Sequence, residues 1–226
     1  MQRKSLGLFI AMMVLVFISC PNPTADTQEN NTISFNISGN IGDWQGGLSD
    51  LPSNVTISTI EFYITNSILD YISGSPTSEM KKVLTVTNLT NNEFNATIHL
   101  ETSELYILPS TLASNVSNTL FSRINQFAYP ESPFDSATVN QISYFNENAK
   151  RFIYICFNND CIIDGFIEYG SGEKYIFNNV SVKTGLNRFS IDNTTPWTQI
   201  NDRWISEWDL KLNNTDIIRA IWTPGM

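Results

Sequence analysis

The sequence predicts a mainly β protein: one or two antiparallel β-sandwiches with one short helix, behind an N-terminal signal peptide. Apolar and polar residues alternate with a period of two in at least three segments, 33–41, 59–65 and 94–101, which is typical of half-buried strands. Turn-rich pieces separate these segments, as they do in sandwiches and barrels. The chain has 226 residues, of which 42% are apolar and 15% are charged, so it is long enough to bury a sizeable core.

The first nineteen residues have the pattern of a secretory signal peptide. Arg3 and Lys4 form a positively charged start, and the apolar run LGLFIAMMVLVFI follows. This run is shorter than the about 20 residues that a spanning helix needs. It leads into Phe17-Ile18-Ser19-Cys20, which resembles a bacterial lipobox, so we expect residues 1–19 to be removed and Cys20 to carry lipid. The alternative is ordinary cleavage beside an incidental cysteine.

Residues 20–32 indicate a flexible tether. After Cys20 the stretch PNPTADTQENNT is polar, contains prolines and has no period. Two or three acyl chains on Cys20, at ~0.8 kcal/mol for each buried methylene group, would hold the mature protein on a membrane. The tether would then lift the folded body away from the bilayer.

We expect residues 33–128 to form the N-terminal half of the β body. It includes a strand at 81–89 that is apolar on both faces. Near its end the residues Leu112, Val116, Leu120 and Ile124 recur every fourth position. This spacing predicts a helix over about 110–124 that packs one face on a sheet.

Residues 137–226 form the second, antiparallel half in this interpretation. The segment 129–136 contains two prolines and indicates an extended link between the halves. The expected strands of the second half are 151–157, 161–169, 173–182, 186–191, 203–212 and 217–222.

Cys156 and Cys161 flank the sequence FNND. Asn158-Asn159 suits a two-residue hairpin turn, because asparagine tolerates positive φ. In that register the cysteines face each other with Cα atoms roughly 4.5–5.5 Å apart, within disulfide range. Since export supplies an oxidising compartment, we expect a disulfide between Cys156 and Cys161. The rival interpretation is a redox or metal pair, but two cysteines without a nearby histidine do not complete a zinc site.

No motif of catalytic or cofactor chemistry is present. The sequence has no phosphate-binding loop, HExxH motif, dinucleotide loop, EF-hand spacing or nucleophile elbow. His99, the single histidine, falls on the polar face of its strand, and Asp192, Asp202 and Asp209 give weak support for a calcium site. We therefore expect no catalytic residue, no metal and no cofactor. An exported hydrolase built from dispersed carboxylates is an alternative, and it would need two carboxyl groups with raised pKa in one cleft.

The tryptophans raise the question of a binding surface. Trp204 and Trp208 share the apolar face of an alternating strand, which predicts that both lie in the core. Trp44 and Trp197 lie in loop-like context, and exported binding modules often stack sugars on exposed aromatic rings. These two are candidate ligand contacts of a carbohydrate-binding or adhesive module, a further alternative function.

The charge of the chain excludes a nucleic-acid partner. The formal net charge is −9 and the isoelectric point is about 4.5, so no basic surface is available to neutralise a phosphate backbone. The sequence contains 26 asparagines together with many serines and threonines. Its solubility therefore comes from amides and hydroxyls more than from charge.

Several short motifs resemble those of small envelope lipoproteins from spirochaete-like bacteria. They are the lipobox, the strand ISGNI at 37–41, the loop DWQGG at 43–47, and Gly185-Leu186-Asn187, which matches a G-W-N strand entry except at Leu186. The resemblance covers most of the chain through short, permissive motifs. It implies an exported β-sandwich lipoprotein and brings no established activity.

These patterns together predict a non-enzymatic structural or binding module of the bacterial cell envelope. We expect lipid anchoring in the outer membrane or at the cell surface ahead of the inner membrane. The expected partners are membrane lipid, through acylated Cys20, and a protein or glycan whose identity the sequence does not give.

Overall fold

The computed structural model describes residues 31–44, 48–50, 55–68, 76–131, 140–201, 203–215 and 219–222. The expected signal peptide, the lipidation site Cys20 and nearly all of the expected tether lie outside these residues. The strands are β1 (Thr32–Trp44), β2 (Leu48–Asp50), β3 (Ile57–Thr65), β4 (Lys81–Thr87), β5 (Glu93–Glu101), β6 (Tyr106–Ile107), β7 (Leu112–Ser114), β8 (Leu120–Pro130), β9 (Asn140–Phe145), β10 (Arg151–Phe157), β11 (Cys161–Glu168), β12 (Glu173–Val182), β13 (Gly185–Ile200), β14 (Arg203–Leu212) and β15 (Arg219–Trp222).

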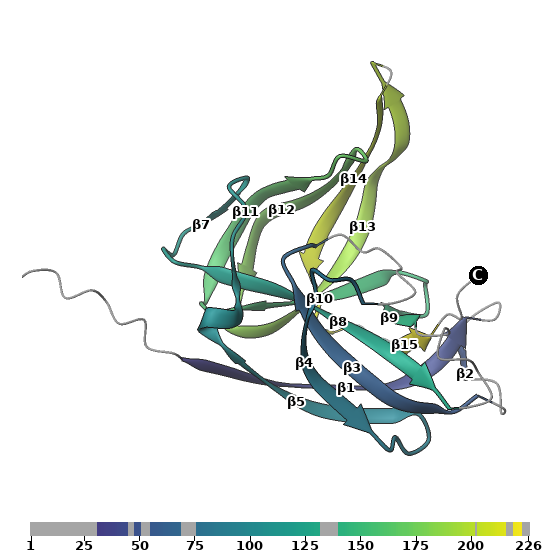
Figure 1. The fold of residues 1–226 in the computed structure, drawn as a ribbon. Helices are drawn as coiled ribbons and strands as arrows, with labels where there is room; N and C mark the ends of the chain where they lie inside the picture. Colours follow the sequence, from purple (N-terminus) through teal and green to yellow (C-terminus); the bar gives the residue numbers. More distant parts are fainter. Residues whose placement is uncertain are drawn as a thin grey trace, which may run out of the picture. The chain divides into compact units, whose positions relative to one another are not determined.

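The molecule is a β-sandwich of mainly antiparallel strands, as the sequence predicts (Figure 1). The first nine residues of β1 pair with β5. The last residues of β1, from Ile41 onwards, pair with β15 and β2 and connect this ladder to the other strands. The larger sheet runs in the order β2-β1-β15-β9-β8-β10-β13-β14-β12-β11-β7, and β3, β4 and β6 connect to it through β8. Two ladders, β1–β15 and β12–β14, are parallel. Residues 31–226 form one compact unit, in which strands from both expected halves pair with each other.

Two apolar clusters form the core, and β10 separates them. Phe152 and Cys156 of β10 belong to the first cluster, together with the inward faces of β1, β3 and β5. Ile153 and Ile155 of the same strand belong to the second cluster, together with residues of β11, β12 and β13. Side chains alternate between the two faces of a strand, so the near-continuous apolar sequence of β10 reflects burial on both faces.

The alternating strands have the burial that their pattern predicts. In β5 the residues Phe94, Ala96, Ile98 and Leu100 are buried, and the residues between them are exposed. β1 has its odd-numbered side chains towards the same cluster. On the outer face of this pair, cross-strand side chains hydrogen-bond to each other, which supports the register.

Asparagines stabilise many of the turns. Among the described residues, seven that are not glycine have a positive φ, and six of these are asparagines: Asn88, Asn91, Asn92, Asn118, Asn179 and Asn201. Asparagine tolerates the left-handed region better than most residues, because its short amide hydrogen-bonds locally. Part of the unusual asparagine content is therefore explained by backbone conformation.

The helix expected over 110–124 is wrong. This segment contains β7, a turn in which Asn118 has a φ of 57°, and the start of β8. The fourfold spacing does not mark one face, because Leu112 packs in the second cluster whereas Ile124 packs in the first. In the described part of the chain, a 3₁₀ turn at Thr102–Glu104 is the only helical element.

The hairpin disulfide is also absent, and both Cys156 and Cys161 are buried free thiols. β10 pairs with β8, β9 and β13, whereas β11 pairs with β7 and β12. The bend between them therefore moves the chain from one set of neighbours to another and does not close a hairpin. Cys156 consequently packs in the first cluster and Cys161 in the second. Burial raises the pKa of the Cys156 thiol to about 12, which keeps it protonated and unreactive.

Candidate functional site

The end of the β13–β14 hairpin extends beyond the strands that support its base (Figure 1). β13 pairs with β10 only as far as Ile191, and β14 pairs with β12 only from Ser206 onwards. Between these points, over residues 193–205, the described strands pair only with each other. We call residues 193–205 the arm.

The arm carries large apolar side chains that face solvent. Trp197 is 46% exposed, Ile200 is 48% exposed and Trp204 is 57% exposed. Gln199 lies opposite Trp204 in the ladder, and Trp197 is two residues from Gln199 in the same strand. Because opposed residues share a face, Gln199 lies on the same side of the arm as Trp204. Trp197 lies where the register of the ladder shifts, between Thr195 and Thr198, so regular alternation is interrupted at this residue.

The base of the arm is fixed by a tight turn after β11. The amide N–H of Ser206 donates a hydrogen bond to the carbonyl oxygen of Gly172, at 3.1 Å. Gly172 has a φ of +94°, and a Cβ atom there would lie 2.0 Å from the carbonyl oxygen of Trp204. Only glycine fits this approach, so the turn holds β14 directly below the exposed part of the arm.

An aromatic row continues from this turn into the sheet. The rings of Trp208 and Tyr175 stack with centroids 6.4 Å apart, and Tyr175 meets Tyr169 edge to face at 6.0 Å. The indole N–H of Trp208 donates to the hydroxyl oxygen of Ser206 at 2.9 Å. Trp208 is therefore held by neighbours, in contrast to Trp204.

The sequence-based interpretation of Trp204 as a core residue is wrong. Trp204 and Trp208 do share a face of β14, but β12 covers that strand only from Ser206 onwards. Alternation in the sequence shows to which face of a strand a side chain points. It does not show how far along the strand neighbouring strands cover that face. The polar run DNTTP at 192–196 is the signal that this part of the hairpin is poorly covered.

The other expected contact residues have different outcomes. Trp197 is exposed on the arm, as expected for a ligand contact. Trp44 is the last residue of β1, and its side chain lies outside the described residues. Trp197 and Trp204 are therefore the two tryptophans that the described residues expose on the arm.

Ion pairs surround the base of the arm. Asp192 contacts the ammonium groups of Lys150 at 2.7 Å and Lys211 at 3.2 Å, and Asp209 lies 3.7 Å from Lys211. Burial raises the pKa of Asp192, but its hydrogen bonds to the two lysines outweigh burial, so the pKa is lowered. In the part of the chain that the structure describes, no three His, Cys, Asp or Glu side chains gather as metal ligands.

Carboxyl groups elsewhere are also arranged as ion pairs. Glu61 accepts hydrogen bonds from Tyr63 and Tyr129 at 2.6 Å and from Lys82 at 2.8 Å. Burial raises its pKa, and these hydrogen bonds lower it further than burial raises it. The pKa values of Glu104 and Asp160 are lowered chiefly by hydrogen bonds from lysines, that of Asp160 to about 2. All these carboxyl groups are stabilised in the charged form.

His99 lies on the exposed outer face of β5. Its Nδ1 atom is 2.7 Å from the hydroxyl oxygen of Ser34 on the neighbouring strand. Within the described residues no carboxylate hydrogen-bonds to its other ring nitrogen. The pair belongs to a row of cross-strand polar contacts, which also includes the Thr97 hydroxyl donating to Asn36 at 2.7 Å.

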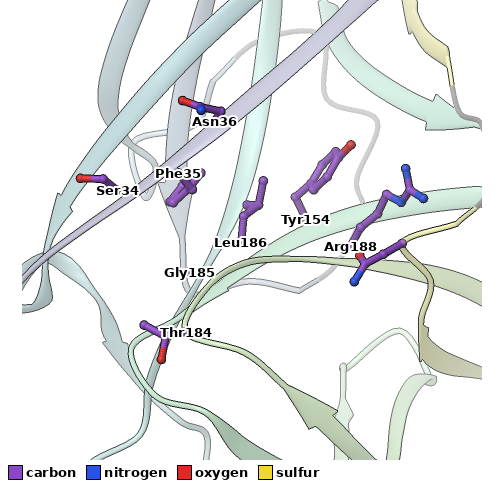
Figure 2. Close-up of a pocket in the computed structure, with 9 residues that line it drawn as sticks. Ser34, Phe35, Asn36, Tyr154, Thr184, Gly185, Leu186 and Arg188 are labelled. Atoms are coloured by element: carbon purple, nitrogen blue, oxygen red, sulfur yellow. The ribbon is translucent and has the colours of Figure 1, made fainter.

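A groove of about 410 Å³ lies beside β1 (Figure 2). Phe35 and Leu186 form its apolar part, and Tyr154, Arg188 and Asn214 form its polar part. The ring of Tyr154 meets Tyr144 edge to face at 4.9 Å. Burial raises the pKa of Tyr154, although the neighbouring guanidinium of Arg188 opposes this shift. None of the described residues that line this groove is a carboxylate.

Comparisons with protein-family models, with curated proteins and with solved structures found no match. Within the described residues, no helix has the length and apolar character needed to cross a membrane.

Proposed function

We propose that this chain is a lipid-anchored protein of the bacterial cell envelope that binds a partner without catalysing a reaction, and that the arm is its contact surface. The observation that carries the proposal is the pair of solvent-facing indoles, Trp197 and Trp204, on a part of the hairpin that neighbouring strands do not cover.

An arm that exposes large apolar side chains lowers the stability of the protein unless these side chains are buried against a partner. A two-stranded ribbon without further support is marginally stable in water, and grouped exposed apolar side chains mark interaction sites. Tryptophan contributes more than most residues at interfaces, because it buries a large rigid area on binding. These properties support binding as the role of the arm.

The carboxyl groups support a non-enzymatic role. A hydrolase of the kind considered above needs a proton donor. Among the residues that the structure describes, the clearly shifted carboxyl groups are Glu61, Glu104, Asp160 and Asp192, and all four have lowered pKa values. Each is engaged with a lysine. Such groups suit ion pairing and not proton donation at neutral pH.

Glycan chains are the ligand class that the arm fits best. The aromatic face of the indole stacks on the C–H face of a sugar ring, and amide and hydroxyl side chains hydrogen-bond to sugar hydroxyls. On the arm, Gln199 lies opposite Trp204, and Thr198 and Asn201 are exposed nearby. Among the described residues of the arm, Arg203 is the one charged residue, and it lies 3.9 Å from the carboxylate of Glu168, which favours a neutral ligand.

The test is binding of the detergent-extracted full-length protein to a glycan array and to purified peptidoglycan sacculi. We expect saturable binding that Trp197→Ala and Trp204→Ala each weaken at least tenfold. Ile107→Ala is the matched control, because Ile107 is 83% exposed but lies on β6, and it should bind like the unchanged protein. Absence of glycan binding, or an equal loss in the control, contradicts the proposed ligand class.

The anchor is tested separately. The full chain, produced in a bacterial host with radioactive palmitate, should become labelled and partition into the detergent phase. Cys20→Ala should abolish both. An unlabelled protein with an unmodified N-terminus other than residue 20 would remove the envelope anchor but leave the binding result to stand by itself.

A further inference from the structure

One edge of β1 has no strand partner over its first residues within the described part of the chain. β1 pairs with β5 from Thr32↔Glu101 to Asn40↔Glu93, and with β15 only from Ile41 onwards. The backbone N–H of Thr102 donates to the carbonyl oxygen of Asn31, and the backbone N–H of Ile41 donates to the carbonyl oxygen of Asn92. Both hydrogen bonds fit the register of the β1–β5 ladder. The odd-numbered residues of β1 are therefore the ones whose backbone groups hydrogen-bond to β5.

The even-numbered residues of β1 must therefore direct their backbone groups to the other edge. In an antiparallel pair, a residue that does not bond to its opposite neighbour points its N–H and C=O away from that strand. Ser34 and Asn36 are such residues, and both line the groove beside β1. Unpaired backbone groups at a strand edge are a template for another strand.

The groove also has chemically different parts. Figure 2 shows Phe35, Leu186, Tyr154 and Arg188 in a row, from the apolar part to the guanidinium. The Nε atom of Arg188 donates to the carbonyl oxygen of Asn213 at 2.6 Å, which fixes the cationic group beside Asn214. Arg188 is the only charged side chain among the groove residues that the structure describes.

Figure 2 shows the two ends of the groove. Ser34 and Thr184 lie towards one end, and Arg188 lies towards the other. β1 runs from Ser34 to Asn36 along this groove, so a strand that enters beside Ser34 and ends near Arg188 runs in the same direction as β1.

We propose that this groove captures the C-terminal segment of a partner polypeptide, which adds to β1 as a parallel strand and places its terminal carboxylate at Arg188. The backbone of Ser34 and Asn36 would supply the strand hydrogen bonds, and Phe35 with Leu186 would receive an apolar side chain. Strand addition and capture of a terminal carboxylate are both established modes of peptide recognition. The site lies away from the arm and does not depend on it.

Local charge favours this occupant although the whole chain is acidic. The net charge of −9 repels an anion only weakly at physiological salt, because charges further away than about 8 Å are screened. The guanidinium of Arg188 lines the groove and stays positively charged at neutral pH, so it attracts a carboxylate there.

The experiment is a selection of linear ten-residue peptides, displayed with free C-termini, on the detergent-extracted full-length protein. We expect enriched peptides with an apolar residue near the C-terminus. The best peptide is then synthesised with a free carboxylate and with a C-terminal amide. The amide should bind at least tenfold more weakly, and this comparison does not depend on the folding of any variant.

A pair of substitutions at one position tests the strand edge. Asn36→Ala and Asn36→Pro both remove the amide that accepts from Thr97, but only proline removes the outward N–H. Asn36→Pro should weaken peptide binding at least tenfold relative to Asn36→Ala, and circular dichroism should show that both are folded. The double variant Trp197→Ala/Trp204→Ala should bind the peptide like the unchanged protein. Equal binding of the amidated peptide, equal binding of the two Asn36 variants, or binding of glycans alone at this groove overturns the proposal.

Discussion

The two halves of β13 lie in opposite environments although they form one strand. From Gly185 to Ile191 it pairs with β10, and its inward side chains are buried in the core. From Asn193 to Ile200 it pairs only with β14, and most of its side chains are exposed. Both halves carry large apolar residues. Neighbouring strands therefore decide whether an apolar side chain stabilises the fold or remains available for binding.

The largest effect is expected in the covered half. Phe189 is fully buried, and its ring lies 5.7 Å from that of Phe177 and 6.4 Å from that of Phe157. Phe189→Ala should lower the free energy of unfolding by about 3–5 kcal/mol, since it leaves a cavity in the second cluster. Urea unfolding followed by tryptophan fluorescence measures this. A loss below about 1 kcal/mol would mean that this half is not the structural support of the hairpin.

The junction between the two halves depends on the turn below the arm. Gly172→Ala places a Cβ atom 2.0 Å from the carbonyl oxygen of Trp204 in a backbone conformation with a φ of +94°. We expect a loss of about 2 kcal/mol and faster hydrogen exchange at the Ser206 amide, which bonds to Gly172. Gly170→Ala is the matched control, because a Cβ atom there meets nothing within 4 Å. Equal effects of the two substitutions would contradict the close approach.

The sequence predicts the alternating strands well, but it assigns the start of β8 to a helix and gives no strand at β9. It also predicts poorly which strands are neighbours. The alternation of β5, from Phe94 to Leu100, gives its buried face correctly, because one covered face leaves a period of two. The same kind of pattern does not reveal which strands pair. Cys156 and Cys161 illustrate this, since they are close in sequence but their strands have different partners.

The sequence predicts only part of the candidate site, because it does not show which strands are neighbours. Trp197 is predicted as a contact because it lies in a loop-like context in the sequence. Trp204 is missed because its place in the β14 alternation is the same as that of the supported Trp208. The groove combines β1 with the start of β13, about 150 residues later in the chain, and no local pattern links these segments.

A third, smaller effect is the dependence of the free energy of unfolding on pH. It arises at Glu61 of β3, a strand that has neighbours on both sides, unlike the strands of the arm. The pKa of Glu61 is lowered in the folded state by its hydrogen bonds. A carboxyl group with a lowered folded pKa contributes stability above its unfolded pKa, and this contribution is lost as pH falls through the folded value. Stability should therefore fall below about pH 4.5, the ordinary value of this group.

Glu61→Gln removes that contribution. We expect a loss of about 1 kcal/mol at pH 7, with the difference from the unchanged protein shrinking as the pH falls below 4.5. Tyr129→Phe removes one of the hydrogen bonds to Glu61 and should reduce the same pH-dependent part. Thermal unfolding from pH 3 to pH 7 measures both. A difference that stays constant over this range would show that Glu61 acts through packing and not through its charge.

The smallest effect on stability is expected at the tip of the arm, and it separates binding from folding. Trp204→Ala should change the free energy of unfolding by no more than about 0.5 kcal/mol, because its side chain is mainly in water. Trp208→Ala, four residues away on the same face, should cost about 2–4 kcal/mol, since its ring stacks on Tyr175 and its N–H bonds to Ser206. If Trp204→Ala destabilised the protein as much as Trp208→Ala does, the exposed indole would be part of the fold, and its availability to a ligand would no longer follow from its position.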